Sequence, residues 1–370
     1  YAPAMDLGLI NYATVYDDTP LEYKASLGRY WPKNAPARYD GLVTVNKAVE
    51  VSKNTVAIKV LKQMTPEYSY NFSQNKLHLN SLVASDKDLA PLALGGLTNG
   101  LTVMEVTAAY SIFPNGGMYS SPRLYTRVLR NDDTVLLERN VNPTYAVSGD
   151  TAQVMTRILQ NVVTNGTASG ITLDKKVAVA GKTGTTNDDK DRYFVGFTPY
   201  YTAGIWVGYD NNGYKHELSS KAGETSFHKK LWSKVMSRIH QNLENKDFDK
   251  PSGIVQVTIC TKSGKLAIPG VCDSDGRSGI VINEYFADGT QPTETCDKHV
   301  LANICADTGL LATTMCPNQI VQSKVLLPAM QEGVAEAVTL DTAYGISANL
   351  QAATCTVHSG GVYVPSLYEQ

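Results

Sequence analysis

The sequence lacks a long apolar run and an excess of charge of either sign. No apolar run approaches the ~20 residues that a helix needs to cross a bilayer, so no membrane-spanning helix is predicted. The 33 Lys and Arg residues nearly balance the 35 Asp and Glu residues, which excludes the basic footprint of a nucleic-acid-binding protein. The start at Tyr1 has no Met, basic stretch or apolar core of a signal peptide. We therefore expect a further segment upstream.

Cysteine is absent from the first 250 residues, and all six cysteines follow. Lys and Arg outnumber Asp and Glu by 28 to 24 up to residue 250 and are outnumbered by 5 to 11 after it. A polar run at 244–253 separates the two parts, as is typical of a linker. We predict a domain over residues 1–248 and a small, β-rich, cysteine-containing extension over residues 249–370.

The extension contains an internal repeat. Residues 260–267 and 305–312 align at an offset of 45, each beginning with Cys and carrying a Gly at the fifth position. Each copy has a second cysteine and ends in a C-x-x-H pair, Cys296 to His299 and Cys355 to His358. Residues 254–260 alternate as a strand does, and Ser263-Gly264 is a turn signal, so each copy is predicted to begin with a β-hairpin.

Two readings of these cysteines stay open. Six cysteines in one small module predict a disulfide framework in an oxidising, extracytoplasmic setting. The repeat favours the pairs Cys260 with Cys272, Cys305 with Cys316, and Cys296 with Cys355, with no metal. Zinc is the alternative, because the two C-x-x-H pairs could supply a Cys2His2 set, although the usual finger spacing is missing.

The first 250 residues predict an α/β domain. Apolar residues recur at helical spacing from Leu42 to Val60, interrupted by Ser52, and 102–113 reads as a helix capped by Thr102. A hairpin is expected over 125–137 and a helix after Ser148. Three strands over 176–186, 192–197 and 202–209 have connections too short for crossover helices, which predicts an antiparallel sheet. A last helix over 225–243 has Phe227, Leu231, Val235 and Ile239 at four-residue spacing.

Two short motifs point to acyl transfer. Lys182-Thr183-Gly184 lies on the first predicted strand, and Ser52-Lys53-Asn54 precedes it by 130 residues. K-T-G and S-x-N, with S-x-x-K, are the motif set of penicillin-binding proteins and serine β-lactamases. Alone, each has an ordinary structural explanation: Ser52 as a small residue in a helix, Lys182 as a solvated strand lysine.

Longer stretches make the resemblance specific. The chain from Tyr1 to about Leu243 resembles the transpeptidase region of class A penicillin-binding proteins, which implies an antiparallel sheet covered by helices. The stretches that carry the resemblance are 1–5, 31–34, 41–55, 92–96, 108–117 and 204–210. The tail resembles extensions of such proteins more weakly.

The residues themselves suit the chemistry that the resemblance implies. A fixed charge on Lys182 favours a carboxylate ligand, and Gly184 leaves room for an extended acyl chain against the strand. The hydroxyls of Thr183 and Thr185 can bond the terminal carboxylate. The resemblance further implies that the Thr185 N–H is an oxyanion donor, that Ser52 relays a proton and contacts Lys182, and that Asn54 holds the substrate amide.

The nucleophile of this family is missing from the sequence. Its S-x-x-K motif lies shortly before the segment that resembles residues 1–5, so we expect it upstream of Tyr1. The S-x-x-K matches at Ser73 to Lys76 and at Ser226 to Lys229 come in the wrong order and are predicted to be ordinary surface residues. The glycosyltransferase region and the membrane anchor of class A proteins are also expected upstream.

The sequence therefore predicts a serine D,D-transpeptidase that crosslinks peptidoglycan stem peptides, is acylated by β-lactams, needs no cofactor and acts on the extracytoplasmic face of the bacterial membrane. Two alternatives stay open. A D,D-carboxypeptidase or β-lactamase would pass the acyl group to water. A non-catalytic scaffold that binds the cell wall would fit the missing nucleophile and the cysteine repeats.

Overall fold

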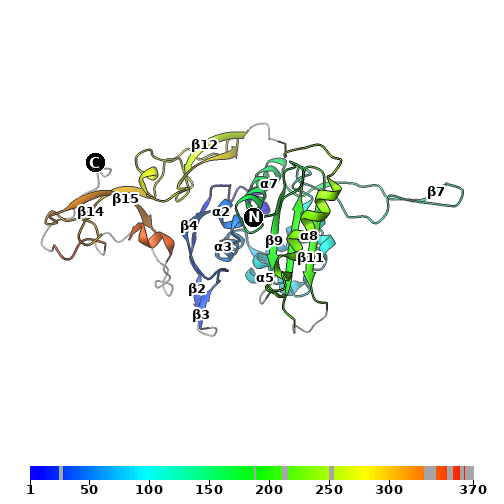
Figure 1. Cartoon of the computed structure of the whole chain (residues 1–370), viewed down its shortest axis with the longest axis horizontal. Coiled ribbons are helices and arrows are strands. Elements are labelled where there is room, and N and C mark those ends of the chain that lie inside the picture. Colours follow the sequence, from blue (N-terminus) through cyan, green and yellow to red (C-terminus); the bar gives the residue numbers. More distant parts are fainter. Residues whose placement is uncertain are drawn as a thin grey trace. The chain divides into compact units, whose positions relative to one another are not determined.

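The computed structural model describes residues 1–24, 28–186, 189–210, 216–249, 254–328, 339–347, 353–358 and 362. These residues form two compact units (Figure 1). The first unit contains residues 1–9, 49–52 and 60–252, and the second contains 10–48, 53–59 and 253–370. The division of the sequence at residue 248 into two domains stays a prediction.

The first unit is built from helices around one three-stranded sheet. Its helices are α1 (Ala2–Asp6), α4 (Pro66–Asn75), α5 (Leu89–Leu94), α6 (Val103–Tyr110), α7 (Gly149–Thr164) and α8 (Glu224–Ile239). Its strands are β5 (Met118–Tyr119), β6 (Arg127–Leu129), β7 (Val135–Glu138), β8 (Thr144–Tyr145), β9 (Ala180–Thr185), β10 (Asp191–Phe197) and β11 (Thr202–Gly208). Helices α2 (Val45–Glu50) and α3 (Asn54–Met64) contribute residues to both units.

The sheet has the order β11-β10-β9, and both pairings are antiparallel. The three predicted strands and their direction are therefore confirmed. The chain forms this sheet because short connections join strands that carry buried apolar residues, such as Phe194 and Phe197 on β10. Strand β9 lies at one edge of the sheet.

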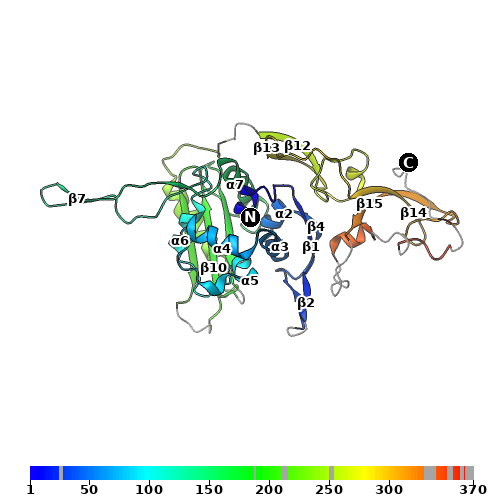
Figure 2. The ribbon, with the colours of Figure 1, turned by 180° about the vertical axis from the view of Figure 1, so that it is seen from behind.

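Helices cover both faces of this sheet. Helix α8 lies in front of it in Figure 1, and α6 lies in front of it in the opposite view of Figure 2. Cross-strand neighbours share a face, and Gly196 of β10 faces Trp232 of α8, whereas Gly204 of β11 faces Thr107 of α6. This confirms the prediction of an antiparallel sheet covered by helices.

Local capping signals located several elements correctly. Thr102 caps α6, and its side chain and that of Glu105 form the predicted capping box. The Ser148 side chain accepts from the N–H of Thr151 at the start of α7. The hairpin expected over 125–137 is formed by β6 and β7.

The buried face of α8 differs from the predicted row. Phe227, Val235 and Ile239 are 50%, 46% and 47% exposed, and the fully buried row is His228, Trp232 and Met236, shifted by one position. Both rows have four-residue spacing, so periodicity alone cannot choose between them. The choice comes from the sheet, where the indole N–H of Trp232 donates to the carbonyl of Ala203 at 2.9 Å.

The apolar stripe from Leu42 to Val60 is not one helix, which corrects the prediction. Leu42 lies in strand β4, which is followed by α2, a turn at Ser52 and then α3. Ser52 has a φ of 60°, in the left-handed region that interrupts a right-handed helix. The N–H of Lys53 closes this turn by donating to the carbonyl of Ala48 at 2.8 Å.

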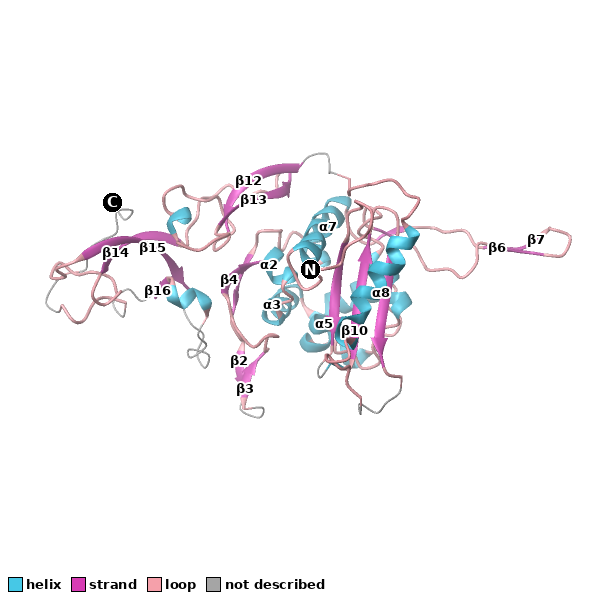
Figure 3. Ribbon diagram, viewed as in Figure 1, coloured by secondary structure: helices cyan, strands magenta, loops and turns pink. Residues whose placement is uncertain are grey.

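The second unit is rich in strands, as expected for the tail (Figure 3). Its strands are β1 (Val15–Asp18), β2 (Glu22–Lys24), β3 (Arg29–Trp31), β4 (Gly41–Thr44), β12 (Ile254–Cys260), β13 (Val281–Ala287), β14 (His299–Cys305), β15 (Gln319–Leu327) and β16 (Gly345–Ser347). Antiparallel pairs join β1 with β4, β2 with β3, β12 with β13 and β14 with β15, and β16 runs parallel to β15.

Each cysteine repeat starts with a strand and a tight turn, and only one residue pair closes each predicted hairpin. These pairs are Ile259 with Leu266 and Ile304 with Leu311. Along most of their length, β12 pairs with β13 and β14 pairs with β15 instead. Across the described parts of the chain, no helix combines the length and apolar character needed to cross a membrane.

Candidate active site

The structure brings Lys182 and Ser52 together. Lys182 lies on β9 opposite Val195, which lies opposite Gly204, so its side chain stands on the face of the sheet that α6 covers. Its Nζ donates to the Oγ of Ser52 at 2.9 Å and to the carbonyl of Thr183 at 3.0 Å. Residues 130 positions apart in the chain thus form one polar pair, as the contact predicted from the motifs requires.

The conformation of Ser52 exposes its hydroxyl. The residue is exposed and has a positive φ of 60°, which is uncommon for a side chain other than Gly or Asn. Its N–H donates to the carbonyl of Val49 at 3.2 Å, which holds the turn. Strained residues of this kind gather at functional sites, where the surrounding fold fixes them.

The ammonium of Lys182 is partly desolvated. Burial lowers the pKa of Lys182 from its ordinary value of 10.5 to about 8. Among the residues that the structure describes, no carboxylate forms an ion pair with it. An unpaired, desolvated cation attracts an anionic ligand, and a pKa near neutrality also allows it to exchange a proton with Ser52.

The other residues of the strand present polar groups at its edge. The hydroxyls of Thr183 and Thr167 share a hydrogen bond of 2.7 Å, and Thr185 Oγ1 accepts from Arg192 at 3.0 Å. The N–H of Thr186 donates to Asp191 of β10 at 3.2 Å. Because backbone groups alternate in direction along a strand, the N–H of Thr185 points toward the outer edge of β9. No strand among the described residues pairs with that edge, so it can accept an extended peptide.

Gly181 and Gly184 of β9 differ in how much space a Cβ atom would have. A Cβ on Gly181 would lie 2.6 Å from the ring of Phe194 and 2.6 Å from the carbonyl oxygen of Val195. A Cβ on Gly184 would lie 3.2 Å from the Cβ of Tyr193. Gly181 therefore allows the strands to pack, and Gly184 has more room.

We expect Gly181→Ala to lower the free energy of unfolding by about 1–3 kcal/mol, because the backbone of Val195 cannot yield to the added methyl group. Gly184→Ala should cost clearly less. Urea denaturation of both variants measures the difference. Equal midpoints for the two variants would contradict the packing role of Gly181.

Sequence reasoning missed Thr167 and Arg192. Thr167 follows the end of α7, and its N–H donates to the carbonyl of Glu50 at 3.1 Å, which joins α7 to α2 beside β9. Only the helix-stop signal Asn165-Gly166 marks this loop in the sequence. Arg192 lies opposite Thr185, and the register of the predicted strands could have indicated it.

Basic and acidic side chains lie together near this end of the sheet, where Arg192 forms an ion pair with Asp189. Lys229 of α8 donates to the carbonyl of Thr167 at 3.4 Å. His228 beside it is buried, and desolvation together with the charges of Arg192 and Lys229 lowers the pKa of His228 to about 4. His228 is therefore neutral at pH 7, and the cations lie on the lysine and arginine side chains.

The remainder of the S-x-N motif is held by the segment around Asn34. The N–H groups of Asn54 and Thr55 donate to Oδ1 of Asn34 at 2.9 and 3.3 Å, so Asn34 caps the start of α3. The side-chain amide of Asn54 donates to the carbonyl of Lys33 at 2.8 Å. The stretch 31–34 therefore fixes the residues that follow Ser52.

Lys53 is buried in an ion-pair network. Its Nζ lies 2.7 Å from Asp18 and 2.6 Å from Asp40. Asp18 is fully buried and also accepts from the side chains of Asn34 and Thr55. This lysine stabilises the second unit and is not available as a proton shuttle.

The two S-x-x-K matches have separate local roles. Ser73 lies in α4, and Lys76 just after α4 donates to the carbonyl of Tyr145 at 3.3 Å. Ser226 in α8 donates to the carbonyl of Gly223 at 3.0 Å. Neither serine is hydrogen-bonded to its lysine partner in the described contacts.

The cysteines differ from the predicted disulfide framework. All six are free thiols in the structure. They form two groups, Cys260, Cys272 and Cys296 with His299, and Cys305, Cys316 and Cys355 with His358. The predicted partners Cys296 and Cys355 belong to different groups, and three thiols in a group leave one unpaired in any internal bridge. The predicted disulfide pairing stays a prediction, and the structure gathers the thiols of each repeat in a group of three.

The comparisons with known proteins agree with this geometry. The family described as the penicillin binding protein transpeptidase domain matches residues 1–236, and the penicillin-binding protein 1A C-terminal domain matches residues 250–301. The chain belongs to the penicillin-binding protein transpeptidase family. The resemblance predicted from the sequence is thereby confirmed.

Curated relatives are penicillin-binding proteins 1A. The protein of that name from Clostridium botulinum is 34% identical over 332 residues, covering 88% of this chain and 39% of the relative. The one from Neisseria gonorrhoeae is 31% identical over 265 residues, covering 69% of this chain and 32% of the relative. The chain thus spans well under half the length of these relatives.

Solved structures share the fold. Penicillin-binding protein 1A from Haemophilus influenzae is similar with a TM-score of 0.62 and 24% identity, covering 80% of this chain and 47% of that one. The PonA1 protein from Mycobacterium tuberculosis in complex with penicillin V has a TM-score of 0.57 and 20% identity, covering 68% of this chain and 69% of that one.

Proposed function

We propose that this chain is part of a D,D-transpeptidase that crosslinks peptidoglycan stem peptides and is acylated by β-lactams. The observation that carries the proposal is the 2.9 Å contact between Lys182 Nζ and Ser52 Oγ beside the open edge of β9. The desolvated ammonium of Lys182 attracts the terminal carboxylate of a peptide, and the hydroxyl of Ser52 lies beside it. The open edge of β9 can pair with the extended peptide backbone.

The reaction has two acyl-transfer steps. First, a serine oxygen bonds to the penultimate D-Ala carbonyl carbon, the C–N bond to the terminal D-Ala breaks, and the serine proton moves to the departing amine. Then an amine of a second stem peptide forms the new amide, the ester C–O bond breaks, and a proton from that amine returns to the serine oxygen. Ser52 is the proposed relay for both protons, with Lys182 adjusting its proton affinity.

The substrate lies along β9 in this proposal. Thr183 and Thr185 bond the terminal carboxylate, the outward N–H of Thr185 is one oxyanion donor, Gly184 leaves room for the acyl chain, and Asn54 holds the substrate amide. We propose that the nucleophilic serine and its lysine come from an S-x-x-K motif in a segment outside these 370 residues, because neither Ser73 nor Ser226 is hydrogen-bonded to its lysine in the described contacts.

The parent protein is proposed to carry a glycosyltransferase region and a membrane anchor in further segments. The relatives named penicillin-binding protein 1A are more than twice the length of their match to this chain. We place the activity on the extracytoplasmic face of the bacterial membrane, where the peptidoglycan substrate is located.

Labelling of the full-length parent protein with fluorescent penicillin tests the proposal. We expect one covalently labelled band that is lost after preincubation with unlabelled penicillin. Incubation with pentapeptide stems should give crosslinked dimers and free D-Ala. Absence of labelling would overturn the proposal in favour of a scaffold, and release of D-Ala without dimers would favour a carboxypeptidase.

The pKa of Lys182 predicts a pH dependence. Below about pH 8 the ammonium is charged and attracts the carboxylate, and as the pH rises through 8 the charge is lost. We expect the second-order rate constant for penicillin acylation to fall above about pH 8. Lys182→Arg keeps its charge and should lack this decline between pH 8 and 10. The same decline in both proteins would assign it to another group.

A further inference from the structure

Each of the two cysteine groups has the composition and dimensions of a metal site. In each, three Sγ atoms and one imidazole nitrogen all lie within 4.8 Å of one another. Zn–S bonds of about 2.3 Å and Zn–N bonds of about 2.0–2.1 Å in a tetrahedron place sulfur and nitrogen ligands about 3.5 Å apart. His299 Nδ1 lies 3.2 Å from the sulfur of Cys260 and 3.7 Å from that of Cys296.

The second group repeats these dimensions. His358 Nδ1 lies 3.5 Å from the sulfur of Cys305 and 3.4 Å from that of Cys355. Both groups therefore present the same ring nitrogen to the sulfurs. Two independent copies with one geometry indicate a common requirement and not a chance gathering of thiols.

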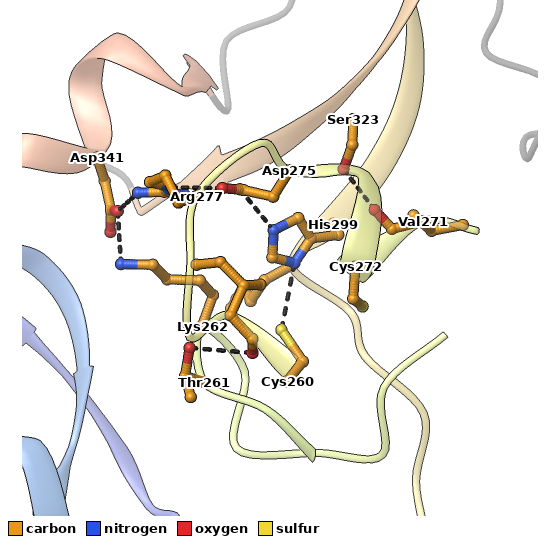
Figure 4. Close-up of polar contacts among 12 residues, drawn as sticks. Cys260, Thr261, Lys262, Val271, Cys272, Asp275, Arg277, His299, Ser323 and Asp341 are labelled. Atoms are coloured by element: carbon orange, nitrogen blue, oxygen red, sulfur yellow. Dashed lines mark hydrogen bonds and ion pairs between the residues drawn. The ribbon is translucent and has the colours of Figure 1, made fainter. Parts of the chain in front are cut away.

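The far side of each histidine faces a carboxylate. His299 Nε2 lies 2.9 Å from Asp275, and His358 Nε2 lies 3.5 Å from Asp307. An Nε2–H that donates to a carboxylate leaves the lone pair on Nδ1. In the first group this Nδ1 faces the sulfur of Cys260 (Figure 4). This is the orientation that a metal-binding histidine needs.

Backbone N–H groups point at the sulfurs of both groups. In the first, Ile268 donates to Cys272 at 3.3 Å and His299 donates to Cys296 at 3.4 Å. In the second, Thr313 donates to Cys316 at 3.2 Å. Such donors stabilise negative charge, which suits thiolates bound to a cation.

A repeated backbone scaffold places the ligands. The N–H of Cys260 donates to the carbonyl of Lys265 at 2.8 Å, and at the offset of 45 Cys305 donates to Leu310 at 2.8 Å. The third cysteine of each copy is fixed in the same way, with Cys296 donating to Leu266 and Cys355 to Leu311, both at 2.8 Å. The same backbone hydrogen bonds thus place the first and third cysteine of each repeat.

These sulfurs also form the core of their modules. All six cysteines are buried, and few apolar side chains pack with them: Ile280 with the first group and Ala312 with the second are the other buried ones. Other buried apolar side chains lie near these clusters, such as Ile259, Val271 and Phe286 in the first repeat and the cluster around Ile304 and Leu311 in the second. Modules this small commonly add a covalent or metal crosslink to such a core.

We propose that each repeat binds one Zn²⁺, the first through Cys260, Cys272, Cys296 and His299 and the second through Cys305, Cys316, Cys355 and His358. Binding releases the three thiol protons and leaves four protein ligands on the metal. Four ligands close the coordination sphere, so both sites are structural. A set of three thiolates and one imidazole in a tetrahedron selects zinc over harder cations. This departs from the sequence-based expectation of disulfides and no metal.

Metal analysis of the purified chain tests this inference. We expect about two zinc ions per chain, one per closed site, and six thiols that react with a thiol reagent only after chelation. Replacement of zinc by Co²⁺ should give the intense visible absorption of tetrahedral cobalt thiolates. Three disulfides in mass spectrometry under non-reducing conditions, with no metal, would overturn the proposal.

Variants separate ligands from structural residues. Cys260→Ala should lower the zinc content to about one per chain, and Cys260→Ala with Cys305→Ala should abolish it. His299→Cys keeps four ligands and should retain two metals with a changed cobalt spectrum, which distinguishes ligation from simple unfolding. Asp275→Asn should weaken zinc at the first site by about 10–100-fold and leave the second unchanged. Unaltered zinc content in Cys260→Ala would contradict the assignment.

Discussion

Lys182→Ala in the full-length protein is expected to lower the rate constant for penicillin acylation by about 10²–10³-fold, the loss typical of removing one charge-stabilising donor. The variant removes the cation that contacts Ser52 and faces the carboxylate of the ligand. Stopped-flow or gel-based labelling with fluorescent penicillin measures the rate. Because Lys182 is half-buried and pairs with no carboxylate among the described residues, its loss should leave stability unchanged or slightly raised.

Lys176→Ala is the matched control. Lys176 lies six residues before Lys182 and is exposed, so its removal changes the charge of the segment equally without touching the pair. We expect its labelling rate to equal that of the unmodified protein. If both variants label as fast as the parent, or both are slowed equally, Lys182 has no specific role in acylation.

Lys53→Met is expected to lower the free energy of unfolding by about 3–5 kcal/mol. The side chain of Lys53 is buried between Asp18 and Asp40. Its removal leaves Asp18 without this cation, whereas Asp40 keeps its ion pair with the exposed Arg38 at 3.3 Å. Asp18 is fully buried and cannot be rehydrated without opening β1. Chemical denaturation monitored by tryptophan fluorescence measures the change.

Lys87→Met provides the comparison for that loss. Lys87 also forms an ion pair, at 2.9 Å from Glu67, but both side chains are solvent-accessible. Exposed pairs contribute little because water screens them, so the denaturation midpoint should hardly move. A similar shift for both variants would mean that burial does not determine the cost at Lys53.

Local signals predicted much of the fold. The caps at Thr102 and Ser148 and the short connections between the strands of the K-T-G sheet are encoded by neighbouring residues. Neighbouring residues do not encode the break in the apolar stripe from Leu42 to Val60, because this break depends on residues distant in the sequence. Asn34 caps the second helix, and β1 holds Leu42 in a strand.

The sequence predicted which two residues of the candidate site would be in contact, but not which larger groups of residues would gather. The motifs brought Ser52 and Lys182 together. Thr167, which shares a hydrogen bond with Thr183 beside Lys182, lies in a loop that has no motif of its own. The repeat likewise located the six cysteines but favoured pairing them. Grouping them in threes requires the parallel bridge between Leu266 and Thr295, which brings Cys296 beside Cys260.

The buried carboxylate of Asp341 joins two distant parts of the sequence. It accepts from the N–H of Leu42 at 2.7 Å, and Lys262 and Arg277 both pair with it (Figure 4). The cysteine-bearing tail is therefore part of the same folded unit as the strand that contains Leu42. A protein shortened at residue 248 would leave the amide of Leu42 without its acceptor, so antibodies or proteases that loosen the tail should also disturb the strand leading to the Ser52 turn.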